Sequence, residues 1–240
     1  MTDSPIRINK YLADKKIASR READTLISDK KVLVNGKVAV LGQHINSGDK
    51  VEVVGATKKY LYLAYYKGRG IITHSPSEGE VDIITRLKKD YSITGVAPLG
   101  RLDKDSEGLI LLTNDGRITG PVLDPEANHE KEYEVTVDKP VTGMFVKLMA
   151  LGVDIEGYRT KPATVVASPR NQKKFTLVIT EGKKHQIRRM CAALGYQVQT
   201  LKRLRVMNIE LGDLKPNQYR KIAGAELKEL MTTLGLQNKL

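Results

Sequence analysis

The stretch GRLDKDSEGLILLTNDG, residues 100–116, joins a polar loop to a short apolar run and closes in a turn. The run 109–112 has the length and composition of a strand that is buried on both faces. The loop before it contains two aspartates, Asp103 and Asp105, and Arg101 lies two residues before the first. A carboxylate at the mouth of a rigid element is a candidate acid, base or nucleophile. The spacing by itself favours neither aspartate.

Downstream of this stretch, two segments alternate between apolar and polar residues, which predicts strands over 131–137 and 175–179. In the first of them Tyr133 shares a face with Val135 and Val137, so its ring should point inward, toward the core or a cleft. A tyrosine in that position is more often a core residue than a functional one. An apolar, aromatic segment over 60–66 is a further strand candidate.

The residues after 185 follow helical spacing, with apolar side chains at 187, 190, 191 and 194 and Gly195 as the stop. Arg188 falls in the first turn of this helix, away from the apolar stripe. Cys191 lies on the stripe, which indicates an unreactive core thiol. Residues 223–234 predict a closing helix.

The N-terminal segment, residues 6–54, predicts a compact unit of two helices and a small hairpin. The sequence Ser19-Arg20-Arg21-Glu22 forms a capping box at the start of the second helix. Asn35-Gly36 suits a tight hairpin turn, with Val38 and Val40 on the return strand and another strand over 51–53. The small, polar and basic residues 55–59 indicate a linker.

Composition narrows the class of partner. The 240-residue chain carries a formal charge of +12, and its isoelectric point near 9.6 favours a polyanion, for which nucleic acid is the usual candidate. A single cysteine excludes an internal disulfide and fits a reducing cytoplasm. We expect no signal peptide, no membrane span and no metal site, because neither apolar runs nor metal-ligand spacings occur.

Two motifs resemble those of a known enzyme family. Gly100-Arg101-Leu102-Asp103 and the segment EGKKHQIRRM, residues 181–190, resemble signatures of the RsuA/RluB/RluE/RluF group of pseudouridine synthases. The N-terminal unit resembles the α-L (S4-like) RNA-binding domain. One segment departs from the family pattern Asn-Lys-Pro-x-Gly, since Tyr66 replaces the asparagine and Gly68 the proline.

The resemblance implies an α+β fold. We expect an S4-like RNA-binding domain over 5–54, a linker over 55–59 and a pseudouridine synthase catalytic domain over 60–240. The catalytic domain should have a central mixed, mainly antiparallel sheet with flanking helices.

The resemblance also assigns roles to residues. Asp103 would be the nucleophile, Arg188 the basic residue that pairs with it, and Tyr133 the ring that stacks on the target base and is a candidate general base. His185 is expected to be an RNA contact or a helix-start residue rather than a catalyst. The residues expected to contact RNA are Arg7, Lys10, Arg20, Arg21, Arg101, Lys183, Lys184, His185, Arg189 and Lys202.

The implied activity is isomerisation of a specific uridine to pseudouridine without any cofactor. The sequence around residues 104–106 and 129–140 is most similar to that of the RluF branch. This branch modifies 23S ribosomal RNA and, in some members, the anticodon of tyrosine tRNA. We expect a cytoplasmic monomer. A non-catalytic RNA-binding or ribosome-assembly factor is the alternative, but it has no need for Asp103, Tyr133 and Arg188 together. A hydrolase using Asp103 and Asp105 is a weaker alternative, because glycosidase carboxylates must flank a sugar.

Overall fold

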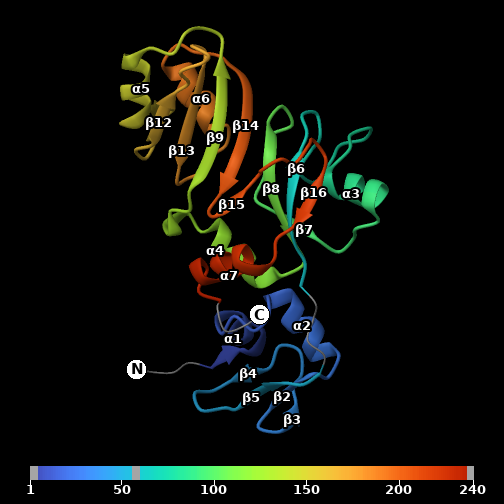
Figure 1. The fold of residues 1–240 in the computed structure, drawn as a ribbon. Coiled ribbons are helices and arrows are strands. Elements are labelled where there is room, and N and C mark those ends of the chain that lie inside the picture. Colours follow the sequence, from blue (N-terminus) through green and yellow to red (C-terminus); the bar gives the residue numbers. More distant parts are fainter. Residues whose placement is uncertain (1–4, 56–59, 237–240) are drawn as a thin grey trace.

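The computed structural model describes residues 5–55 and 60–236, so most of the predicted linker lies outside the described residues. A small N-terminal module sits beneath a larger unit built on a long, twisted sheet (Figure 1). Among the described residues, no helix has both the length and the apolar character needed to cross a membrane.

Two helices and a three-stranded sheet form the N-terminal module. Helices α1 (Ile8–Asp14) and α2 (Arg20–Ser28) pack over strands β2 (Val32–Val34) and β5 (Val51–Val53). Strand β3 (Lys37–Val38) pairs with β2, and β1 (Ile6–Arg7) pairs with β4 (His44–Ile45). Ser19 caps α2, since its Oγ accepts a hydrogen bond from the Glu22 backbone at 3.3 Å. Positive φ angles at Asn35 and Gly36 form the predicted hairpin turn.

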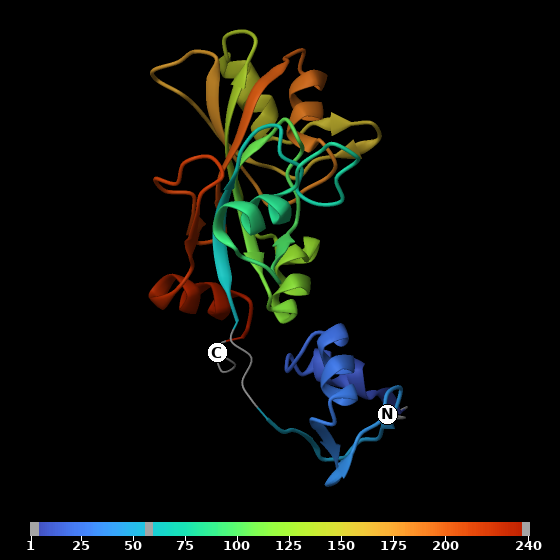
Figure 2. The same cartoon turned by 90° about the vertical axis from the view of Figure 1, so that its right-hand side faces the viewer.

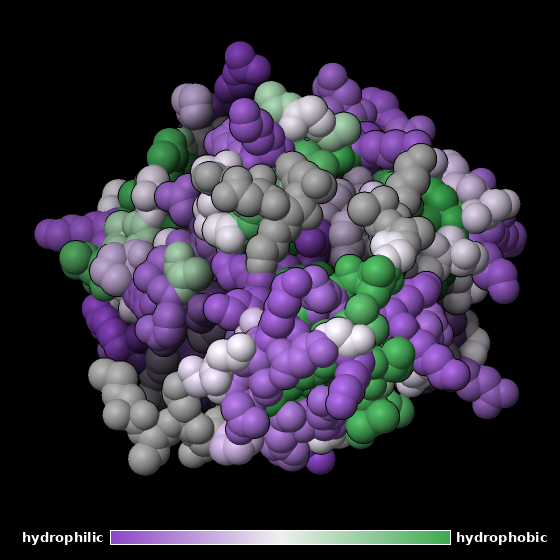
Figure 3. Space-filling model, turned by 90° about the horizontal axis from the view of Figure 1, so that it is seen from below, coloured by the Kyte–Doolittle hydropathy of each residue, from purple (hydrophilic) through white to green (hydrophobic). Residues whose placement is uncertain are grey.

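The return strand of this hairpin is shorter than its sequence predicted. Strand β3 ends at Val38, and the side chains of Val38 and Val40 are exposed instead of packed. Figure 3 views the molecule from the side of this module, where hydrophilic residues dominate the surface and a hydrophobic patch interrupts them.

The large sheet has the strand order β12-β13-β9-β14-β8-β6-β16, with β15 attached to β14 and β7 to β8. Only β8 and β14 run parallel among its described ladders, so the predicted mixed, mainly antiparallel sheet is confirmed. The strands are β6 (Tyr62–Lys67), β7 (Ala97–Leu99), β8 (Glu107–Thr113), β9 (Lys131–Val137), β12 (Thr164–Ala167), β13 (Lys174–Ile179), β14 (Val198–Val206), β15 (Ile209–Glu210) and β16 (Tyr219–Lys221). A separate hairpin pairs β10 (Asp154–Ile155) with β11 (Tyr158–Arg159).

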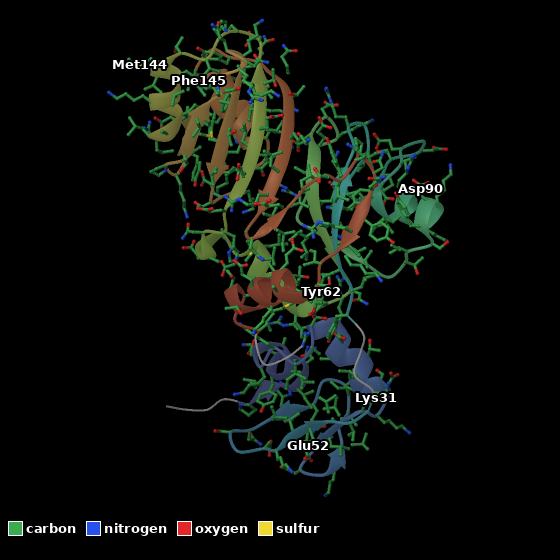
Figure 4. All side chains as sticks on the ribbon, in the orientation of Figure 1. Lys31, Glu52, Tyr62, Asp90, Met144 and Phe145 are labelled. Atoms are coloured by element: carbon green, nitrogen blue, oxygen red, sulfur yellow. The ribbon has the colours of Figure 1, made fainter. Side chains whose placement is uncertain are left out.

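Helices cover the sheet differently at its two ends. Helices α5 (Gly143–Ala150) and α6 (Gln186–Ala193) lie at the β12–β13–β9 end. Figure 4 labels Phe145 and Met144 in α5; Phe145 is buried in that core, while Met144 is exposed. At the other end, α3 (Ile83–Tyr91) and α7 (Gly224–Thr233) lie on opposite faces of β6 and β8.

Strand β8 is buried on both faces because its side chains alternate between two cores. Leu109 and Leu111 pack in the core that contains α7, whereas Ile110 and Leu112 pack in the core that contains α3. The apolar run 109–112 is therefore confirmed as a doubly buried strand. After it come a short 3₁₀ turn (Gly116–Ile118), α4 (Thr119–Leu123) and a second 3₁₀ turn (Pro125–Ala127).

The N-terminal module lies below the sheet in Figure 2 and contacts the large unit at the residues after α7 and at the turn after β8. Lys16 Nζ donates hydrogen bonds to the carbonyls of Leu234 and Gly235, at 3.0 and 3.2 Å. Ser19 lies so close to Gly116 that a Cβ there would come within 2.6 Å of it. Tyr62, labelled near this junction in Figure 4, donates a 2.6 Å hydrogen bond to Asp115.

Candidate active site

The loop that carries Asp103 is fastened from below by a buried lysine. Lys67, the last residue of β6, is fully buried, and its ammonium donates to the carbonyls of Ser106 at 2.6 Å, Ile71 at 2.8 Å, Gly68 at 3.1 Å and Lys104 at 3.4 Å. Burial lowers the pKa of Lys67 to about 8, partly offset by nearby carboxylates, of which Asp103 is the strongest. Two of the four acceptors belong to the Asp103 loop, so Lys67 fixes its path.

Thr73 fastens the same loop on the other side of Asp103. Its hydroxyl donates to the Leu102 carbonyl at 2.7 Å and accepts from the Leu102 backbone N–H at 3.0 Å. Neither Lys67 nor Thr73 was identified from the sequence. A lysine at the end of an otherwise apolar strand was the one available signal, since a buried cation requires a dedicated set of acceptors.

Replacing Lys67 with methionine should lower the free energy of unfolding by about 3 kcal/mol, because four carbonyls lose their donor and two of these contacts are buried. Lys104→Met is the matched control, since Lys104 is exposed and makes a surface ion pair with Glu80; its expected effect is below about 1 kcal/mol. Urea unfolding of both variants measures the difference. Equal midpoints for the two would contradict the fastening role of Lys67.

Asp103 opens onto a cavity of about 440 Å³, whereas Asp105 does not line it. The Asp103 side chain is 33% exposed, and Asp105 is exposed to solvent outside the cavity. The tertiary structure thus distinguishes two carboxylates that spacing could not. The cavity is large enough for a nucleoside-sized ligand and lies at the crossing of several elements.

Tyr133 and Arg188 line the same cavity as Asp103. Tyr133 is 7% exposed and stands in β9 between β13 and β14, with Leu177 and Arg203 as its strand partners. Its ring is therefore both a core residue and a wall of the cavity. The three residues named by sequence motifs meet at one place, although they come from a loop, a strand and a helix.

The expected ion pair between Asp103 and Arg188 is not formed. The Arg188 guanidinium bonds to the carbonyls of Val198 at 3.3 Å and Asp105 at 3.4 Å, and to Ser106 Oγ at 3.4 Å. The Asp103 carboxylate instead pairs with His185, whose Nδ1 lies 3.0 Å from Oδ2. His185, which was expected to contact RNA or to start a helix, thus occupies the position expected for Arg188.

The turn before α6 is held by one buried carboxylate. Glu181 is 6% exposed and accepts from Gln186 Nε2 at 2.6 Å, from the Lys161 backbone at 3.0 Å and from the Tyr158 hydroxyl. Gln186 in turn accepts from the Lys183 backbone at 2.9 Å. These contacts explain why residues 181–190 include a glutamate and a glutamine. Glu181 and Gln186 shape the turn that presents residues 183–185 to the cavity.

The other residues expected to contact RNA are divided by the fold. Arg101, Lys183 and Lys184 line the cavity together with His185. Lys202 does not, because it points to the opposite side of β14 from Leu201 and Arg203 and places its ammonium 5.1 Å from the Tyr66 ring centre. Arg7, Lys10, Arg20 and Arg21 are exposed on the N-terminal module.

Arg189 is likewise directed away from the cavity, and its visible role is structural. Its guanidinium bonds to the Ile155 carbonyl at 3.1 Å and to the Glu156 carboxylate at 2.8 Å. These contacts tie α6 to the β10–β11 hairpin.

The charge of the cavity suits an anionic ligand. Its cationic lining residues outnumber its acidic ones; they are Arg101, Lys131, Lys183, Lys184, Arg188 and Arg203 against Asp103, Asp124 and Glu181. Burial, and then the nearby Arg203, lower the pKa of Lys131. Within the described ranges, no group of three or more His, Cys, Asp or Glu side chains could hold a metal ion.

Cys191 is fully buried on the inner face of α6, as its position on the apolar stripe predicted. Burial raises the pKa of its thiol to about 12. We therefore expect iodoacetamide at pH 8 to leave the native protein unmodified and to alkylate one thiol after denaturation. Intact-mass measurement checks this, and rapid modification of the native protein would contradict it.

Comparisons with known proteins find relatives in the same family that the sequence motifs resemble. A family model described as RNA pseudouridylate synthase matches residues 61–193, and one described as S4 domain matches residues 6–51. "Dual-specificity RNA pseudouridine synthase RluF" of Escherichia coli (strain K12) is 40% identical over 240 residues, covering 96% of this chain and 80% of that protein. "Ribosomal large subunit pseudouridine synthase B" of Bacillus subtilis (strain 168) is 33% identical, with coverages of 93% and 95%.

A solved structure gives the same result for the fold. The chain titled "Crystal structure of pseudouridylate synthase" superposes with a TM-score of 0.67 and 27% identity, covering 95% of this chain and 99% of that one. The first family match spans more than half of the chain. It includes the segments that carry Asp103, Tyr133 and Arg188.

Proposed function

Because the chain belongs to the RNA pseudouridylate synthase family and is an RNA pseudouridine synthase, we propose that it isomerises one specific uridine of 23S ribosomal RNA, with Asp103 as nucleophile. The observation that carries the residue assignment is the cavity on which Asp103, and not Asp105, opens. A relative named for the large ribosomal subunit supports the RNA class. The name of the Escherichia coli relative includes dual specificity, which supports a second RNA substrate, and we propose tyrosine tRNA for it.

The reaction breaks the N1–C1′ bond of uridine, rotates the uracil and forms a C5–C1′ bond. The proton on C5 then leaves, and N1 gains one, so substrate and product are isomers. Such chemistry needs an ionised carboxylate and a pocket that lets the detached base turn. In the proposed mechanism Asp103 supplies the carboxylate, which attacks as an anion.

Tyr133 is proposed to hold the base during its rotation. Its ring is fixed in the central strand β9, so it offers a rigid stacking face with one polar atom at the cavity. The hydroxyl is the candidate acceptor for the C5 proton. Arg188 and its cationic neighbours place positive charge around Asp103 and around the phosphates of the bound nucleotide.

A uridine inside a helix must be flipped out to enter this cavity, at a cost of a few kcal/mol. Phosphate contacts offset that cost, and we propose Arg101, Lys183 and Lys184 for them at the cavity. On the N-terminal module, the exposed Arg7, Lys10, Arg20 and Arg21 are proposed to bind RNA remote from the reacting base. A complete cavity within one chain supports action as a monomer, and the proposed ribosomal RNA substrate implies the cytoplasm.

The experiment is to incubate the protein with unmodified 23S ribosomal RNA and, separately, with unmodified tyrosine tRNA, and to map pseudouridine by chemical adduct sequencing. One new pseudouridine in 23S RNA, absent with Asp103→Asn, is the expected result. No new site in either RNA with the wild-type protein would refute the substrate proposal. Modification of tRNA alone would replace the proposed substrate class. RNA binding without modification would favour the non-catalytic alternative.

A further inference from the structure

The Asp103 carboxylate has one side-chain partner within the part of the chain that the structure describes, and it is His185. The imidazole Nδ1 lies 3.0 Å from Asp103 Oδ2. Both side chains are partly exposed at the cavity, 46% for His185 and 33% for Asp103. An ionised carboxylate can only accept hydrogen bonds, so Nδ1 carries the hydrogen of this contact.

The backbone at His185 is held in a conformation that few residues adopt. Its φ of +52° lies in the left-handed region, which disfavours side chains other than those of glycine and asparagine. The surrounding hydrogen bonds enforce it: the Gln186 backbone donates to the Lys183 carbonyl at 3.1 Å, and the Arg189 backbone donates to the His185 carbonyl at 3.0 Å. The hydrogen bonds that Glu181 accepts from Lys161 and Gln186 fix the start of the same turn. The turn thus directs His185 toward a residue 82 positions away in the sequence.

The charges around the pair explain why Asp103 needs a fixed partner. Each element packed around the cavity contributes one or more of them: Arg101 from the Asp103 loop, Asp124 after α4, Lys131 from β9, Glu181 after β13, Lys183 and Lys184 from the turn, Arg188 from α6 and Arg203 from β14. A carboxylate free to rotate would be attracted to several of these cations in turn. The 3.0 Å hydrogen bond from His185 selects one orientation, and productive attack requires one orientation.

We propose that His185 is a positioning residue for Asp103, holding the carboxylate in its attacking orientation through the Nδ1–H hydrogen bond. This inference rests on the proposed function and deepens it. The Nδ1–H donor fixes the direction of the Asp103 carboxylate and takes no part in the bond changes.

Four variants test this idea by separating the imidazole from the backbone. His185→Asn places an amide N–H near the position of Nδ1 and suits the left-handed backbone. His185→Gly and His185→Ala both remove the donor, and only glycine relieves the strain. His44→Asn is the control, since His44 is exposed in β4 of the N-terminal module. Single-turnover rate constants and KM on a 23S RNA fragment are measured for each variant at one pH, with melting temperatures as a check on folding.

We expect His185→Gly and His185→Ala to lower the rate constant about 10- to 100-fold with little change in KM. His185→Asn should keep the rate constant within about threefold of the wild-type value, because its amide supplies the N–H donor. His44→Asn should have the wild-type rate constant. A wild-type rate in either donor-less variant overturns the proposal. An effect on KM alone also overturns it, because His185 would then act in RNA binding. A His185→Asn variant as slow as His185→Gly and His185→Ala overturns it as well. Wild-type pseudouridine formation tests the proposed function separately.

Discussion

Asp103→Asn should lower kcat by about 10⁴-fold or more while leaving RNA affinity close to that of the wild-type protein, because the amide cannot act as an anionic nucleophile. The substitution keeps the size of the side chain, and the carboxylate is not needed to fold the loop, which Lys67 and Thr73 hold through the backbone. Multiple-turnover assays with a 23S RNA fragment give kcat and KM, and filter binding gives the affinity.

The matched control for this prediction is Asp105→Asn, two residues along the same loop. Asp105 is exposed and does not line the cavity, so its substitution should keep kcat within about threefold. The comparison therefore tests the one choice that the sequence left open. A large loss with Asp105→Asn and a small one with Asp103→Asn would reverse the assignment, while equal losses would indicate that loop charge, and not one nucleophile, matters.

Gly108→Ala should lower the free energy of unfolding by about 3 kcal/mol or more. A Cβ at Gly108 would lie 2.3 Å from the carbonyl oxygen of Arg203 and 2.5 Å from its nitrogen, and the φ of +107° is itself unfavourable for alanine. These backbones meet where β8 pairs with β14, and Arg203 also donates to the Leu109 carbonyl at 2.7 Å. Any relief of the clash must open the parallel ladder beside the Asp103 loop.

The melting temperature of Gly108→Ala should fall by about 6–12 °C. Gly143→Ala is the control, because Gly143 begins α5 with negative φ and has no atom within 4 Å of its would-be Cβ. That change should be within about 1 kcal/mol of neutral. Thermal unfolding of the two variants tests this prediction. If Gly108→Ala were as stable as Gly143→Ala, the β8–β14 ladder could accommodate a Cβ at Gly108 without loss of stability.

Local patterns predicted the elements around the site well, because period and composition report on burial. The run 109–112 is the doubly buried centre of β8, the alternation of 131–137 is β9, and the stripe with Cys191 is the inner face of α6. The hairpin at Asn35-Gly36 follows from the positive φ that such residues accept. The predicted return strand was too long, because alternation alone does not show whether a second layer covers it.

Long-range contacts were beyond the sequence for a physical reason. The role of Lys67 was not predicted because its four acceptors are backbone carbonyls. Every residue has such a carbonyl, so no sequence motif identifies the acceptors. Gly108 lay next to a predicted strand, yet its need for a small residue comes from Arg203, 95 positions away. The direction of Lys202 depended on the register of β14, which local composition does not specify.

For this protein, then, the sequence by itself determined the strand and helix at the site, the basic character of the chain and, through two motifs, its family. Tertiary structure alone decided which aspartate opens onto the cavity and which side chain contacts its carboxylate. The motif placed Arg188 against Asp103, but the left-handed turn enforced by Glu181 and its partners brings His185 there instead. A motif records which residues are present, whereas the partner of a carboxylate is set by distances that arise only when loop, strand and helix pack together.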